Sequence, residues 1–150
     1  MYERLIIEAE KENIEVVEIS FRSNVKGLYS DGVIATKKSM SNKEKATILA
    51  EELGHYHKTY GNILDQSSII NRKEERKARI WAYKRLIGLL DIIDAYKAGI
   101  KNRYELSEYL GVTEEFIIEA IEYYRDRYGL YVRLDNYYIY FEPLGVLECL

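Results

Sequence analysis

The sequence predicts an α+β fold, with a mostly helical core that includes a small antiparallel sheet and a helix-turn-helix-like C-terminal lobe with a β-hairpin. Three observations lead to this prediction. Several segments place apolar residues at helical spacing. β-rich runs flank the turn residues 31–32 (Asp-Gly) and 135–136 (Asp-Asn), which indicates two hairpins. No repeat or low-complexity linker divides the chain, so we expect a core over 1–100 and a lobe over 101–150 packed on it.

The N-terminal elements follow from local sequence. Residues 3–12 form an amphipathic helix, and Asn13 after it suits the left-handed conformation that ends many helices. Residues 14–21 are rich in β-branched side chains. Residues 27–36 contain two short runs around an Asp-Gly pair, which is typical of a type I′ turn. We therefore expect a sheet of about three strands before the next helix.

Helices dominate the middle of the chain. Residues 41–44 (Ser-Asn-Lys-Glu) have the spacing of a capping box, so a helix begins there and continues through residues 51–55. A second helix is expected from about residue 72 to 87. Gly88 interrupts the pattern, and a further helix is expected over residues 89–98.

The last third has the pattern of a helix-turn-helix with a wing. Residues 104–110 form the first helix, residues 111–112 the turn, and Thr113 the N-cap of the second helix. Residues 131–141 then form a hairpin in the position of a wing, and Pro143 is expected to end it.

Composition narrows the class of protein. A formal net charge of −3 over 150 residues gives no general attraction to nucleic acid or to an acidic membrane. The single cysteine, Cys149, leaves no internal disulfide and suits a reducing compartment. The charged opening segment lacks an apolar signal core, and no run reaches membrane-spanning length. We expect a cytoplasmic protein.

The pattern with the most chemistry is Glu51-Glu52-Leu53-Gly54-His55, which has the spacing of the H-E-x-x-H metal-protease motif with glutamate in place of the first histidine. Glu51 and His55 lie four residues apart and share one helix face, so they could hold a metal ion. Glu52 stands where such enzymes keep the base that deprotonates water. Glu75 on the next helix is the candidate for the third ligand.

A charged segment of this kind is, taken alone, more often a solvated helix face. Two features shift the balance toward a site. The helix is otherwise apolar, so its carboxylates are expected to be partly buried, where a metal would offset the cost of burying their charge. Gly54 costs about 1 kcal/mol inside a helix, which suggests that another backbone or a ligand approaches closely there.

Residues 48–56, together with Glu75-x-x-Ala78-x-x-Trp81-Ala82, resemble the ImmA/IrrE metallo-endopeptidases. The resemblance covers about residues 1–100 and implies a metalloprotease-like core. It implies His55 and Glu75 as metal ligands and Glu52 as the general base, with Glu51 at the position of the first histidine. It further implies a divalent metal, with Zn²⁺ expected first and Mn²⁺ as the alternative. The implied partner is a protein substrate, a phage- or mobile-element-type helix-turn-helix transcriptional repressor.

Two alternatives remain open. The first is a catalytically inactive relative that binds a repressor or other protein without cleaving it. The second is a DNA-binding regulator acting through residues 104–141. The charges of the C-terminal lobe argue against the second alternative, because residues 102–150 carry four arginines against ten acids. Glu114 and Glu115 also begin the helix that would face DNA phosphates. We therefore do not expect nucleic acid as a partner.

Overall fold

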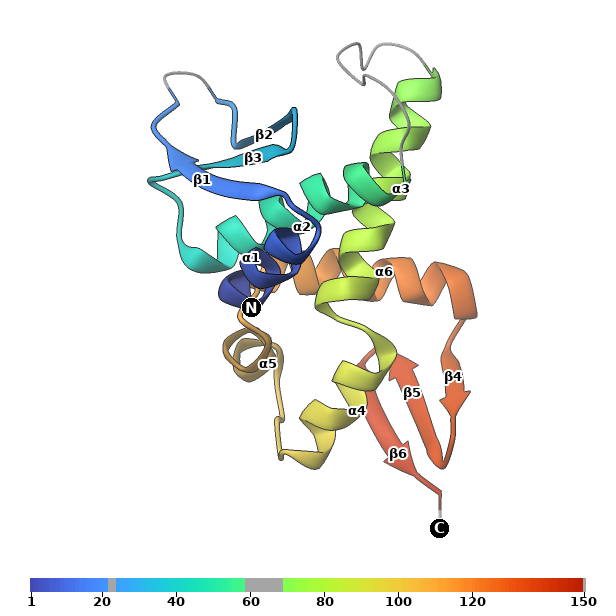
Figure 1. Ribbon diagram of the computed structural model, residues 1–150. Coiled ribbons are helices and arrows are strands. Elements are labelled where there is room, and N and C mark those ends of the chain that lie inside the picture. The colour runs from blue at the N-terminus through green and yellow to red at the C-terminus, as the bar shows by residue number, and fades with distance from the viewer. Residues whose placement is uncertain (22–23, 59–68, 150) are drawn as a thin grey trace. The chain divides into compact units, whose positions relative to one another are not determined.

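A computed structural model describes residues 1–21, 24–58 and 69–149 (Figure 1). The chain forms two compact units, Met1–Ala82 and Tyr83–Leu150. The predicted α+β class is confirmed, since helices predominate and each unit contains a small sheet. In the part of the chain that the structure describes, no helix is long and apolar enough to cross a membrane.

The N-terminal unit places helices beside a three-stranded sheet. Its elements are α1 (Tyr2–Lys11), β1 (Glu15–Ile19), β2 (Gly27–Ser30), β3 (Val33–Lys37), α2 (Asn42–Lys58) and most of α3 (Ile69–Leu86). The expected turn joins β2 to β3, with positive φ at Asp31 and Gly32. Asn13 also has positive φ after α1, as its sequence position predicts.

The first sheet has strand order β1-β3-β2, and it is mixed, whereas the sequence predicted an antiparallel sheet. β2 is antiparallel to β3, as the hairpin requires, and β1 runs parallel to β3 along its other edge. The Asp-Gly turn fixes only the pairing of β2 with β3. The partner of β1 depends on the path of the chain between β1 and β2, which the turn does not specify.

Helix α2 is held against the sheet and α1 by apolar packing. Leu49 and Leu53 are almost fully buried, and α2 contacts α1, β2 and β3. The predicted capping box is present at its N-terminus, where the Ser41 hydroxyl accepts a hydrogen bond from the Glu44 amide at 3.2 Å. The helix that carries Glu51, Glu52 and His55 is therefore fixed in position by both its cap and its buried face.

The C-terminal unit combines three helices with an antiparallel sheet. These elements are α4 (Leu89–Lys97), α5 (Arg103–Leu110), α6 (Glu114–Tyr128), β4 (Tyr131–Leu134), β5 (Tyr137–Phe141) and β6 (Leu144–Glu148). Thr113 is the N-cap of α6, as predicted, and its hydroxyl accepts a hydrogen bond from the Phe116 amide at 3.1 Å. Gly111, in the left-handed conformation, ends α5 and completes the helix-turn-helix pattern.

The wing differs from the prediction at its end. Pro143 does not terminate the sheet, because the chain turns there and returns as β6, antiparallel to β5. Proline lacks the N–H that a central strand needs, but it is tolerated in a turn between strands.

The C-terminal unit contains a buried hydrogen bond that joins α6 to the segment after α3. Tyr124 is 2% exposed, and its hydroxyl donates to the carbonyl oxygen of Ile87 at 2.9 Å. The ring of Tyr124 also stacks on that of Phe141. Burial raises the pKa of Tyr124 well above its ordinary value, so the hydroxyl stays protonated and remains a donor.

We predict that Tyr124→Phe lowers the free energy of unfolding by about 1–2 kcal/mol, because the Ile87 carbonyl loses its buried donor while the ring packing remains. Denaturant unfolding monitored by circular dichroism measures this change. Tyr128→Phe is the control, because Tyr128 is 42% exposed and the same deletion should cost little there. Equal stability of Tyr124→Phe and wild type would contradict the prediction.

Candidate metal site

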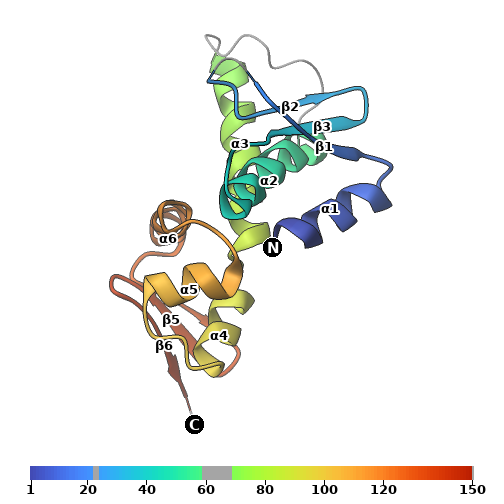
Figure 2. The ribbon, with the colours of Figure 1, turned by 90° about the vertical axis from the view of Figure 1, so that its left-hand side faces the viewer.

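Helices α2 and α3 touch backbone to backbone within the N-terminal unit (Figure 2). A Cβ atom added to Gly54 would lie 2.5 Å from the carbonyl oxygen of Ala78, too close for any real side chain. Ala78 is itself fully buried. The glycine that interrupts helix propensity therefore has the packing role that its sequence position suggested.

Two side-chain pairs bridge the helices on either side of this crossing. A carboxylate oxygen of Glu51 lies 3.1 Å from the Arg79 guanidinium. On the other side, His55 Nε2 lies 3.2 Å from Glu75 Oε1. In each pair one residue comes from α2 and the other from α3, so the close crossing brings together groups about twenty residues or more apart in sequence.

Glu52 lies on α2 between these pairs in sequence, and its carboxylate is directed toward β2. A Cβ atom on Gly27 of β2 would stand 3.7 Å from Glu52 Oε1. Burial raises the pKa of Glu52 to about 7, and the negative charges of Glu51 and Glu75 add to this increase. A carboxyl group with this pKa can exchange a proton near neutral pH.

The structure thus brings His55 and Glu75 together and places Glu52 within the field of Glu51 and Glu75. Across residues 1–21, 24–58 and 69–149, however, no group of three His, Cys, Asp or Glu side chains is arranged to hold a metal ion. Glu51 bonds to Arg79 in this arrangement. The ligand roles of Glu51, His55 and Glu75 and the catalytic role of Glu52 therefore remain predictions.

Arg79 is the residue that sequence reasoning did not include in the site. The sequence could have indicated that Arg79 lies near the site, because Arg79 follows Glu75 by four residues and shares its helix face. Its partner on α2 could not be identified without knowing where the two helices cross.

The pair His55 and Glu75 fits a metal ion. Two ligands about 2.1 Å from a tetrahedral ion have donor atoms about 3.4 Å apart, and the observed separation is 3.2 Å. An imidazole with carboxylates suits Zn²⁺, Mn²⁺ or Fe²⁺. Glu51 has suitable chemistry as the third ligand, and one of its carboxylate oxygens is paired with the Arg79 guanidinium.

His57 is not directed to this site. Its Nε2 atom lies 3.4 Å from a carboxylate oxygen of Glu12, and its ring stacks on Trp81 with centroids 5.0 Å apart. His57 lies two residues beyond His55, so the two point to different sides of α2. Its role is packing and pairing near the end of the helix.

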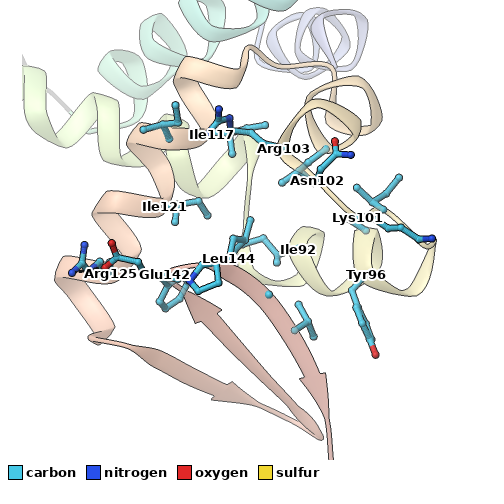
Figure 3. A pocket seen from close by; sticks show the side chains of 18 of the residues that line it. Ile92, Tyr96, Lys101, Asn102, Arg103, Ile117, Ile121, Arg125, Glu142 and Leu144 are labelled. Carbon is cyan, nitrogen blue, oxygen red and sulfur yellow. Dashed lines mark ion pairs between the residues drawn. The ribbon is translucent and has the colours of Figure 1, made fainter.

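A separate cavity of about 800 Å³ lies entirely within the C-terminal unit (Figure 3). Ile92, Ile117 and Leu144 contribute to its apolar lining. Arg125, also on the lining, forms an ion pair with Glu142 at 2.6 Å, so these two charges are mutually satisfied. None of the predicted catalytic or metal-binding residues lines this cavity.

The chain matches a known protein family. The family described as "Peptidase_M78: IrrE N-terminal-like domain" matches residues 9–122, which is most of the chain. The matched range includes α2 and α3 with the crossing and both side-chain pairs. No curated protein and no solved structure shows a significant match to the chain.

We predict that Gly54→Ala destabilises the protein. The added methyl group meets backbone at Ala78, and overpacking of this kind costs about 1–3 kcal/mol. Alanine has a higher helix propensity than glycine by about 1 kcal/mol, and this gain in stability offsets only part of that cost. Thermal unfolding measures the net loss. Gly145→Ala is the matched control, because a Cβ atom there meets nothing within 4 Å. A Gly54→Ala variant as stable as wild type would mean that the helices do not approach this closely.

A second prediction concerns pH. The pKa of Glu52 in the folded protein, about 7, lies above its ordinary value of 4.5. As pH rises, the unfolded chain therefore loses the Glu52 proton at a lower pH than the folded protein does. The contribution of Glu52 to stability is therefore complete below about pH 4.5 and is lost as pH rises through about 7, by up to about 3 kcal/mol. Glu52→Gln removes this dependence.

Urea unfolding with a chelator present, at about pH 5 and about pH 8, tests this prediction. The Gln variant should gain stability relative to wild type at the higher pH. Glu115→Gln removes an exposed carboxylate from α6 and should show no such change between the two pH values. A constant difference between Glu52→Gln and wild type would show that Glu52 is not buried as described.

Proposed function

Because the chain belongs to the peptidase family of the IrrE N-terminal-like domain, we propose that it is a metal-dependent endopeptidase acting on a protein substrate. The observation that best supports this proposal is the meeting of His55 and Glu75 from two helices at 3.2 Å, with the carboxyl group of Glu52 nearby. The proposed substrate is a phage- or mobile-element-type helix-turn-helix repressor, which rests on the family resemblance of residues 48–56 and Glu75.

The proposed roles follow from the chemistry of each side chain. His55 and Glu75 hold the metal ion, with Glu51 as the third ligand once it is released from Arg79. A divalent ion held by these residues, Zn²⁺ or Mn²⁺, would supply Lewis acidity toward a peptide carbonyl and lower the pKa of water at the site. Glu52 accepts the proton of the attacking water and passes it to the leaving amine, for which a pKa near 7 is suited.

The protein is proposed to act in the cytoplasm. The exposed Cys149 has no disulfide partner, which suits a reducing compartment. A DNA-bound repressor would also be found there.

A second candidate function is a relative that binds its protein partner without cleaving it. The pair Glu51–Arg79 favours this alternative, because the guanidinium already neutralises the residue that replaces the first histidine of the motif. A DNA-binding regulator is a weaker third candidate. Its helix α6 exposes Glu115, Glu122 and Asp126, which phosphates would repel.

A cleavage assay separates the first two functions. Purified protein with Zn²⁺ or Mn²⁺ is incubated with a candidate repressor encoded nearby, and products are identified by mass spectrometry. We expect cleavage by wild type and a loss of at least about 100-fold in Glu52→Gln, because the general base is gone. Metal content should be unchanged in Glu52→Gln and reduced in His55→Ala, since only the second change removes a ligand.

The control is Glu115→Gln, which should cleave like wild type because it alters a carboxylate outside the candidate site. A stable complex between wild type and repressor without cleavage, in protein that lacks metal, would favour the non-cleaving alternative. Cleavage that persists in Glu52→Gln would remove Glu52 from the mechanism.

A further inference from the structure

We propose that Arg79 is an internal competitor for the metal ion, holding Glu51 in the metal-free protein so that the third ligand becomes available only when this ion pair opens. The inference rests on the proposed function, since it concerns a metal site formed by Glu51, His55 and Glu75. It adds a residue that neither the motif nor the family resemblance contains.

The geometry of the pair supports this role. Arg79 Nη1 lies 3.1 Å from Glu51 Oε1, and the Glu51 side chain is 22% exposed. Arg79 directly follows Ala78, whose backbone meets Gly54 at the helix crossing. The backbone of Arg79 is therefore held close to Glu51 by the helix crossing, and this position allows the ion pair to form.

The charges near the crossing explain why a cation belongs there. Glu51 and Glu75 lie close enough to Glu52 that their negative charges raise its pKa. Without a counter-charge these carboxylates repel one another, and Arg79 offsets the repulsion at Glu51. A divalent ion would offset the same repulsion more strongly. A guanidinium and a metal ion repel each other, so binding of the metal and retention of the Glu51–Arg79 pair oppose each other.

The strength of this competition is limited by exposure of the arginine. The Arg79 side chain is 41% exposed, so solvent screens the ion pair and its contribution is modest. Opening the pair permanently should therefore tighten metal binding by about three- to tenfold, and not by several orders of magnitude.

Metal titration of full-length variants tests the proposal, with Zn²⁺ and Mn²⁺ as the probes and a fluorescent chelator as competitor. We expect Arg79→Gln to bind both ions about three- to tenfold more tightly than wild type. Lys77→Gln is the matched control, because it removes the same charge from the same helix. The partner of Lys77 is Glu74, which lies on α3 and is not one of the proposed ligands. Lys77→Gln should change metal affinity much less than Arg79→Gln.

Repeating the titration in a Glu51→His variant shows whether a gain in metal affinity comes from release of Glu51 or from the loss of a positive charge. In Glu51→His, the neutral imidazole remains a possible ligand but no longer attracts the guanidinium. Adding Arg79→Gln to this variant should then change metal affinity no more than adding Lys77→Gln does. A full three- to tenfold gain in this background would overturn the proposal, because Glu51 would not be what Arg79 withholds.

The remaining outcomes separate this inference from the proposed function. Wild type that binds metal as tightly as Arg79→Gln overturns the competitor role and leaves the metallopeptidase proposal intact. Absence of metal binding in both proteins overturns both proposals. Circular dichroism establishes that each variant is folded, and Arg79→Lys gives a second comparison, since it keeps the charge but loses the planar guanidinium. Its gain in metal affinity should be smaller than that of Arg79→Gln, and an equal gain would count against the proposal.

Discussion

The close approach of α2 and α3 at Gly54 and Ala78 is the constraint on which the candidate site depends. Without a side chain at Gly54, the backbones of two helices come near enough for short bridges on both sides of the contact. Glu51 reaches Arg79 on one side and His55 reaches Glu75 on the other. A wider crossing would separate both pairs. The spacing of the two helix backbones therefore determines whether these charged side chains can pair.

Charge then decides what the crossing can hold. Three carboxylates near one imidazole form a site with excess negative charge, and such a site is stabilised by a cation or by proton uptake. The protein shows both responses. Arg79 supplies a positive charge to Glu51, and Glu52, with a pKa of about 7, is partly protonated near neutrality. The groups that balance charge at this crossing are therefore the same ones to which the proposed peptidase chemistry is assigned.

The C-terminal unit is organised by local capping and by aromatic packing. Thr113 fixes the start of α6, and Tyr124 ties that helix to the carbonyl of Ile87. The family match extends into this unit, to residue 122, so the helix-turn-helix pattern is partly inside the matched region. A fold that resembles a DNA-binding motif here carries an acidic exposed helix face, which shows that the arrangement of helices alone does not assign a nucleic-acid function.

The sequence by itself determined the features that depend on neighbours within a few residues. The capping box at Ser41, the positive-φ turn at Asp31 and Gly32, and the shared helix face of Glu51 and His55 all belong to this class. Only the tertiary structure decided the parallel partner of β1, the return of the chain after Pro143 as β6, and the pairing of Glu51 with Arg79. The physical reason is that a cap or a turn is closed by adjacent side chains and backbone, whereas a partner on another element depends on where and at what distance two elements cross.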